Sequence, residues 1–202
     1  MGFDQEWGLT PKLTHNKSIL GLKCVGMNSN STLALAPLTP PEGLPRLGRL
    51  QVYTAPQRTF FAEVMALAIR SAGHGQRVLI VQFLKGGIRQ GLQHPMKLVQ
   101  HLDWIRCPIP RCVDTPDVQE EEAQAIYQLW QATQNLVLSG QYQLVVLDEL
   151  ILAVHLGLLG LIEVVSFLHQ RPPMLDLIIT GTTLPAEILA LADQVTELRR
   201  PG

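Results

Sequence analysis

Two short runs of almost uninterrupted apolar residues constrain the fold of this chain more than any other feature. Residues 78–83 read VLIVQF between glycine-containing turns, and residues 144–147 read LVVL directly before an acidic pair. A strand that is apolar on both faces has to be covered on both faces, which is typical of a parallel sheet enclosed by helices. The two runs therefore predict an α/β fold with a buried sheet.

Further strands and helices are predicted to alternate along the same part of the chain. Additional strands are expected at 50–54, 103–107, 175–180 and 195–198. Helices are expected at 61–72, 118–139, 158–170 and 185–193, the longest of them opened by a capping box from Asp117 to Glu120. Such alternation forms βα units with right-handed crossovers. We therefore expect a three-layer, mostly parallel, doubly wound sheet with helices on both faces and ligands beyond the carboxyl ends of the strands.

The first 48 residues do not follow this pattern. They contain five prolines and a polar NSNST run at 28–32, and neither a helical nor a strand period persists in them. We interpret residues 1–48 as an irregular, proline-rich N-terminal extension, which is either a draped segment or a functional arm. Residues 49–202 are predicted to form one α/β domain.

Composition excludes several classes of protein. A hydrophobic content of 47% with 16% charged residues excludes a disordered chain. The formal net charge of -1 argues against nucleic-acid binding, and the sequence lacks the roughly 18 continuous apolar residues of a membrane span. The three cysteines fit neither a zinc spacing nor a disulfide framework, which indicates a reducing compartment. We expect a cytoplasmic protein.

Charged residues follow both apolar runs. Asp148 and Glu149 follow one run, as in a Walker B element, where the Asp positions magnesium and the Glu positions a water or substrate. The same pair is also compatible with solvated acids or a helix cap at an exposed strand end. Lys85 follows the other run beside two glycines, where its amine either reaches an anion or is solvated.

The segment 54–62 joins the first strand to the first helix, at the place of a phosphate-binding loop. Such a loop needs glycines that turn backbone N–H groups toward phosphate, a Lys, and a Ser or Thr for magnesium. The segment reads TAPQRTFFA, which contains no glycine, and Pro56 has no N–H to donate. Taken alone, it is an ordinary connection.

Taken together, these segments resemble the ATP:corrinoid adenosyltransferases of the bacterial cobalamin pathway. The resemblance covers about residues 50–200 in matching order and spacing. It is carried by residues 51–54, 72–78, 81–86, 145–150, 171–172, 179–181 and 192–198. It implies a RecA-like P-loop NTPase fold, usually a homodimer, and transfer of the adenosyl group of ATP to cob(I)alamin or a related corrinoid, with magnesium and release of triphosphate.

The chain departs from this family at the phosphate-binding loop, which in the family reads Gly-x-Gly-Lys-Gly-Lys-Thr-Thr. Phe60 stands where the essential Lys would be, and Phe61 where the magnesium-binding hydroxyl would be. Arg58 aligns with a different basic residue of that loop. At about 1.5–3 kcal/mol per charged hydrogen bond, the two losses cost about 3–6 kcal/mol, or roughly two to four orders of magnitude in affinity. The stretch 110–114 also lacks the aromatic residues that the family places beside the corrinoid.

We therefore predict a family member with a degenerate Walker A loop: a non-catalytic pseudoenzyme that binds another protein or acts as a scaffold. A protein partner would use the 54–62 loop surface or the N-terminal extension, and a homodimer is possible. Two large apolar groups at Phe60 and Phe61 suggest a filled or adhesive surface. Neither a nucleic acid nor a membrane is an expected partner.

Two alternatives remain open: a divergent but active ATP:cob(I)alamin adenosyltransferase, and a corrinoid carrier without chemistry. No cofactor is expected unless the family activity is retained, in which case ATP, magnesium and a corrinoid are implied. Arg58, Lys85 and Glu149 would then contact the nucleotide, and Asp148 would hold the magnesium.

Overall fold

The computed structural model describes residues 47–88, 90–96 and 99–199. The predicted extension over 1–48 lies outside the described residues apart from its last two. Within the described residues, no helix has both the length and the apolar character that crossing a membrane requires.

Six parallel strands form the central sheet, in the order β3-β2-β4-β5-β1-β6. Their bounds are β1 Leu50–Ala55, β2 Val78–Gln82, β3 Leu102–Arg106, β4 Leu144–Asp148, β5 Asp176–Thr182 and β6 Gln194–Glu197. Every residue of β2 and β4 is buried, as their apolar runs require, and so are the polar residues at their ends, Gln82 and Asp148. The prediction of a three-layer, RecA-like parallel sheet is confirmed.

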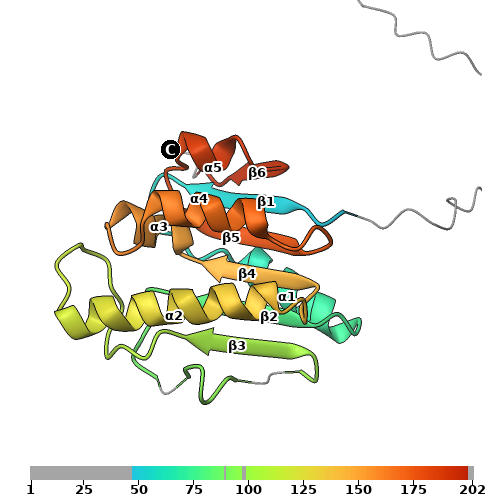
Figure 1. Cartoon of the computed structure of the whole chain (residues 1–202), viewed down its shortest axis with the longest axis horizontal. Helices are drawn as coiled ribbons and strands as arrows, with labels where there is room; N and C mark the ends of the chain where they lie inside the picture. The colour runs from blue at the N-terminus through green and yellow to red at the C-terminus, as the bar shows by residue number, and fades with distance from the viewer. Residues whose placement is uncertain (1–46, 89, 97–98, 200–202) are drawn as a thin grey trace, which may run out of the picture. The chain divides into compact units, whose positions relative to one another are not determined.

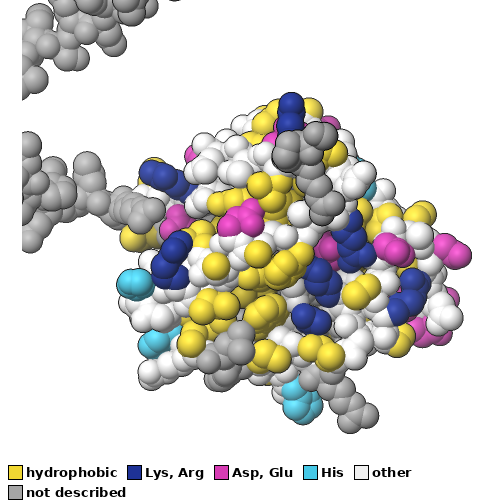
Figure 2. Space-filling model, turned by 180° about the vertical axis from the view of Figure 1, so that it is seen from behind, with side chains coloured by type: hydrophobic (Ala, Val, Ile, Leu, Met, Phe, Trp, Pro, Cys, Tyr) yellow, Lys and Arg dark blue, Asp and Glu magenta, His cyan; other side chains and the backbone are white. Residues whose placement is uncertain are grey.

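Helices cover both faces of this sheet (Figure 1). Helix α1 (Ala62–Gly73) packs on one face, where its buried residues join one apolar cluster with β2, β4 and β5. Helices α2 (Glu120–Leu138), α3 (Leu150–His155) and α4 (Leu161–Gln170) pack into the cluster on the other face, which the short α5 (Ala186–Leu189) also joins. Seen from the α1 side, hydrophobic side chains form a band across the molecule, and Lys and Arg gather toward the carboxyl ends of the strands (Figure 2).

Two local predictions need correction. The capping box at the start of α2 joins Gln119 and Glu122, not Asp117 and Glu120; a carboxylate oxygen of Glu122 accepts a hydrogen bond from the backbone N–H of Gln119 at 3.2 Å. The region predicted as one helix at 158–170 contains only α4. The preceding helix, α3, was not predicted, because residues 150–154 are apolar on every side and therefore show no helical period.

Gly181 in β5 allows α3 to pack closely on the sheet. A Cβ atom at this position would lie 2.6 Å from Cβ of Ile151 and 2.9 Å from the backbone nitrogen of Leu152. One of these atoms belongs to the backbone of α3 and the other is bonded directly to it, so neither can move without the helix. Only glycine fits this contact.

We expect Gly181→Ala to lower the free energy of unfolding by about 1–3 kcal/mol, as overpacking in a core does. Gly73→Ala at the end of α1 is the matched control, because its added Cβ meets nothing within 4 Å. Urea denaturation followed by circular dichroism measures both variants. Equal stability of the two variants would show that the α3–β5 contact adjusts easily.

Candidate functional site

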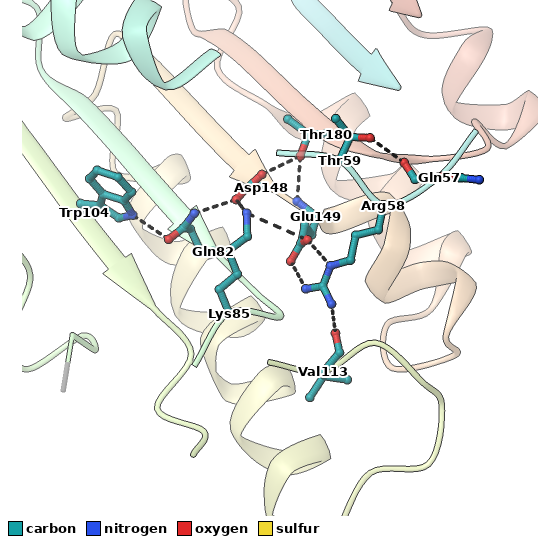
Figure 3. A network of polar contacts seen from close by, with 10 residues as sticks. All are labelled: Gln57, Arg58, Thr59, Gln82, Lys85, Trp104, Val113, Asp148, Glu149 and Thr180. Atoms are coloured by element: carbon teal, nitrogen blue, oxygen red, sulfur yellow. Dashed lines mark hydrogen bonds and ion pairs between the residues drawn. The ribbon is translucent and has the colours of Figure 1, made fainter. Parts of the chain in front are cut away.

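The residues singled out by the sequence come together at the carboxyl ends of the strands (Figure 3). Arg58 comes from the loop between β1 and α1, and Lys85 from the turn after β2. Asp148 is the last residue of β4, and Glu149 follows it directly. Because the carboxyl ends of parallel strands share one edge of the sheet, these four side chains meet although they are far apart in sequence.

The carboxylate of Asp148 is completely buried, with 0% of the residue exposed, and both of its oxygens accept hydrogen bonds. Gln82 Nε2 and Lys85 Nζ donate to Oδ2 at 2.7 and 2.6 Å, and Thr180 Oγ1 donates to Oδ1 at 2.8 Å. The interpretation of the acidic pair as solvated groups at an exposed strand end is therefore wrong. A buried charge needs these partners to offset its lost hydration.

Glu149 has a left-handed backbone conformation that is uncommon for residues other than glycine, with φ of 64°. Its backbone N–H donates to Thr180 Oγ1 at 2.9 Å, and only 3% of the residue is exposed. The sharp turn ends β4 and starts α3 at the next residue. It places the Glu149 carboxylate beside the 54–62 loop, on the far side of Asp148 from Gln82 (Figure 3).

Arg58 binds this carboxylate with two parallel hydrogen bonds. Its Nε donates to Glu149 Oε1 at 2.6 Å and its Nη2 to Oε2 at 2.7 Å, while Nη1 donates to the backbone oxygen of Val113 at 2.9 Å. The hydrogen bonds to Glu149 raise the pKa of the Arg58 guanidinium, so that it stays charged. One side chain thus joins three segments of the chain.

The four charged groups balance one another. Lys85 Nζ lies 2.6 Å from Asp148 and 4.0 Å from Glu149 Oε1, which brings the two ion pairs into contact. The ring of Phe60 lies on another side of Lys85, with its centroid 5.0 Å from Nζ, a favourable position for a cation–π contact. Two cations and two carboxylates leave no net charge at the centre of the site.

Three further residues extend this network, and sequence reasoning did not assign them a role there. Trp104 Nε1 donates to Gln82 Oε1 at 3.0 Å, so a line of hydrogen bonds runs from β3 through β2 and β4 to Thr180 on β5. Trp104 is partly buried. The available signal was a Gln and a Thr within otherwise apolar strands, near the same edge as Asp148.

The two phenylalanines of the loop, Phe60 and Phe61, lie in different environments. Phe61 is 1% exposed and packs between α1 and the sheet, with its ring centroid 6.2 Å from that of Tyr53. Phe60 is 56% exposed. The expectation was a filled or adhesive surface. Phe61 fills space in the core and contributes nothing to a surface, whereas Phe60 is exposed.

The connection between β3 and α2 closes over the same edge. Val113 is buried, and its N–H donates to the backbone oxygen of Leu84 at 2.9 Å. Arg111 binds Glu122 at the start of α2 through Nε and Nη2, at 3.0 and 2.8 Å. The hydrogen bond from Arg111 lowers the pKa of Glu122 and keeps it ionised. Together with Arg58, these contacts fix the segment 110–114.

The residues present do not fit magnesium and a triphosphate. The oxygens of Asp148 and Glu149 already accept hydrogen bonds from Thr180, Gln82, Lys85 and Arg58. The loop has no Lys, and the hydroxyl of its Thr59 donates to the backbone oxygen of Gln57 at 2.9 Å. The described residues also contain no cluster of three or more His, Cys, Asp or Glu side chains that could hold a metal ion. The roles predicted for the four charged residues toward nucleotide and metal stay predictions.

Known proteins resemble this chain over most of the α/β domain. A family model described as ATP:corrinoid adenosyltransferase BtuR/CobO/CobP matches residues 46–201. The corrinoid adenosyltransferase of Escherichia coli K12 is 32% identical over 154 residues, which cover 75% of this chain and 76% of that protein. Corrinoid adenosyltransferase CobA of Salmonella typhimurium is 33% identical with the same coverage. The corrinoid adenosyltransferase of Pseudomonas aeruginosa is 29% identical over 75% of this chain and 74% of that protein.

Removing Arg58 leaves the buried Glu149 carboxylate without its main partner. We expect Arg58→Met to lower the free energy of unfolding by about 3 kcal/mol, the lower end for a broken buried pair because Arg58 is partly exposed. The double variant Arg58→Met with Glu149→Gln should recover much of this loss, since it leaves no charge unpaired. Urea denaturation measures all variants.

Arg199→Ala is the matched control, because Arg199 pairs with Glu197 at the surface and should contribute less than about 1 kcal/mol. An Arg58→Met variant as stable as Arg199→Ala would refute the structural importance of the Arg58–Glu149 pair.

Proposed function

This chain belongs to the ATP:corrinoid adenosyltransferase family, and from this premise we propose that it is a non-catalytic member, a pseudoenzyme that acts by binding another protein or as a scaffold. One observation carries the proposal. The two carboxylates at the Walker B position are already neutralised by Lys85 and Arg58 of the same chain. The edge of the sheet where the family's chemistry is expected is thus closed by internal ion pairs.

Nucleotide binding would have to break these pairs. A phosphate that takes Arg58 leaves Glu149 buried and unpaired, and one that takes Lys85 leaves Asp148 with only its neutral partners. Leaving a buried charge unpaired costs about 3–5 kcal/mol. This penalty adds to the about 3–6 kcal/mol estimated for the missing Lys and hydroxyl of the loop.

The same residues that close the site offer a surface for a partner. The exposed ring of Phe60 stands beside Lys85 at the edge of the closed site, and the loop that carries it is held by Arg58. A rigid, exposed aromatic side chain is a common anchor in protein interfaces. We place the partner-binding surface on the 54–62 loop. The homodimer that the family resemblance implies is a further proposal, which sedimentation of the full chain measures.

A divergent active adenosyltransferase is the second candidate. It is favoured by the presence of Asp148, Glu149 and Lys85 in one place, with Lys85 Nζ within 4.0 Å of both carboxylates. In that case Asp148→Asn should abolish turnover. The 54–62 loop is the feature that opposes this candidate.

Calorimetric titration of the full chain with Mg-ATP tests the proposal. We expect no saturable binding at micromolar concentration, and no triphosphate release when cob(I)alamin is added, because neither the loop nor the paired charges accommodate phosphate. The Escherichia coli relative, measured in parallel, is the positive control.

Micromolar binding together with triphosphate release would contradict the pseudoenzyme and establish the active alternative. A change in corrin absorbance on mixing with cobalamin, without triphosphate release, would instead favour a corrinoid carrier and count against a purely protein-binding role.

A further inference from the structure

A cavity of about 370 Å³ lies on the α2 side of the edge strand β3, lined by residues that take no part in the ion pairs. Its walls are the turn that contains Gln90–His94, the ring of Pro108 and the face of α2 that carries Ala125 and Leu129. We propose that this cavity is a binding site for a small, uncharged heteroaromatic molecule that carries an N–H donor.

The outer wall is fixed to the sheet by backbone hydrogen bonds. Arg106 N–H donates to the Gln90 oxygen at 2.6 Å, and Met96 and Trp104 exchange two bonds at 2.9 and 3.0 Å. The turn itself is closed by the His94 N–H, which donates to the Gly91 oxygen at 3.1 Å. The space between this turn and α2 is therefore part of the folded structure, and a ligand need not create it.

The described part of the lining favours an uncharged ligand. Its inner part is apolar, with Leu129 buried beside Ala125 and Pro108. Among the described residues that line it there is neither Lys, Arg, Asp nor Glu, and His94 is the one titratable residue of this set. A charged ligand group would lose hydration here without gaining a partner of opposite charge. Gly91, Ala125 and the Pro108 ring present small or flat surfaces, which suit a planar ring.

Gln90 specifies the hydrogen-bonding group. The residue is 4% exposed, and its Nε2 donates to the backbone oxygen of Trp104 at 3.0 Å, which fixes the orientation of the amide. None of the described residues donates to Oε1, and Gln90 is among the residues that line the cavity, so the proposal assigns this oxygen as the acceptor for the ligand. A ring N–H is the complementary donor. The amides of Gln93 and Gln128 add exposed polar groups to the lining.

The size of the cavity sets the size of the ligand. Ligand pockets in proteins span about 300–1,000 Å³, so this cavity takes one or two fused rings. A corrin macrocycle with its amide side chains is far larger. The residues that line the cavity take no part in the ion pairs of Arg58 and Lys85, so this proposal does not depend on the proposed loss of catalysis.

Titration of the ¹⁵N-labelled full chain with indole, followed by NMR, tests this proposal. We expect saturable shifts confined to the backbone amides of 90–94 and of the facing turn of α2. 1-Methylindole, which lacks the N–H donor, should bind about tenfold more weakly, since it leaves Gln90 Oε1 without a partner. Indole-3-acetate, which adds a carboxylate, should also bind more weakly than indole.

Two variants separate this cavity from other sites. Ala125→Trp fills the cavity and should abolish the indole shifts, whereas Ala66→Trp, at an exposed position of α1 on the other face of the sheet, should leave them unchanged. Circular dichroism confirms that both variants are folded. Absence of saturable indole binding, or equal binding by Ala125→Trp and Ala66→Trp, would overturn the proposal, and equal binding of indole and 1-methylindole would overturn the role of Gln90.

Discussion

The burial of two neighbouring carboxylates is the constraint on which the carboxyl edge of this sheet depends. Asp148 is completely buried and Glu149 almost so, and each therefore needs a cation and hydrogen-bond donors from the protein itself. Lys85 and Arg58 are the cations, and each comes from a different loop. The acids therefore determine where the loops lie: the 54–62 loop through Arg58, the turn after β2 through Lys85, and the segment 110–114 through the Val113 oxygen.

This arrangement gives the same residues a structural task that competes with nucleotide binding. In a working P-loop, the backbone N–H groups and the Lys are directed at phosphate. Here the basic group of the loop faces a carboxylate, and Phe61 of the same loop fills space between α1 and the sheet. The loop is thus ordered by the protein interior, and a ligand is not required to order it. The loss of the phosphate site that we propose would be compatible with family membership for this reason.

Sequence patterns predicted the layers of the fold well, because burial on both faces leaves a direct signature in strands such as β2 and β4. They also located the charged residues, since residues that end parallel strands share one edge. They did not predict which groups pair. The environment of Asp148 depends on Gln82 and Thr180, whose polarity in an apolar strand is visible but whose partners are set by strand order. Helix α3 and the burial of Phe61 were not predicted for a related reason. The sequence alone does not tell whether an apolar residue lies in the core or at the surface until its neighbours in space are known.

The difference in exposure between Phe60 and Phe61 limits which side chains a binding function at this edge could use. A residue that is fully buried cannot contact a partner, so the apolar attraction of the loop surface reduces to one exposed ring beside one lysine. The Lys85 ammonium is itself paired with the Asp148 carboxylate, and 17% of the Lys85 side chain is exposed. Its charge is therefore largely neutralised within the molecule. The partner that we propose at this surface would therefore be recognised by shape and apolar contact with Phe60, and a strongly anionic partner would gain little. This argues for a protein surface as the partner at the 54–62 loop, since a phosphate-bearing ligand would find the cations already paired.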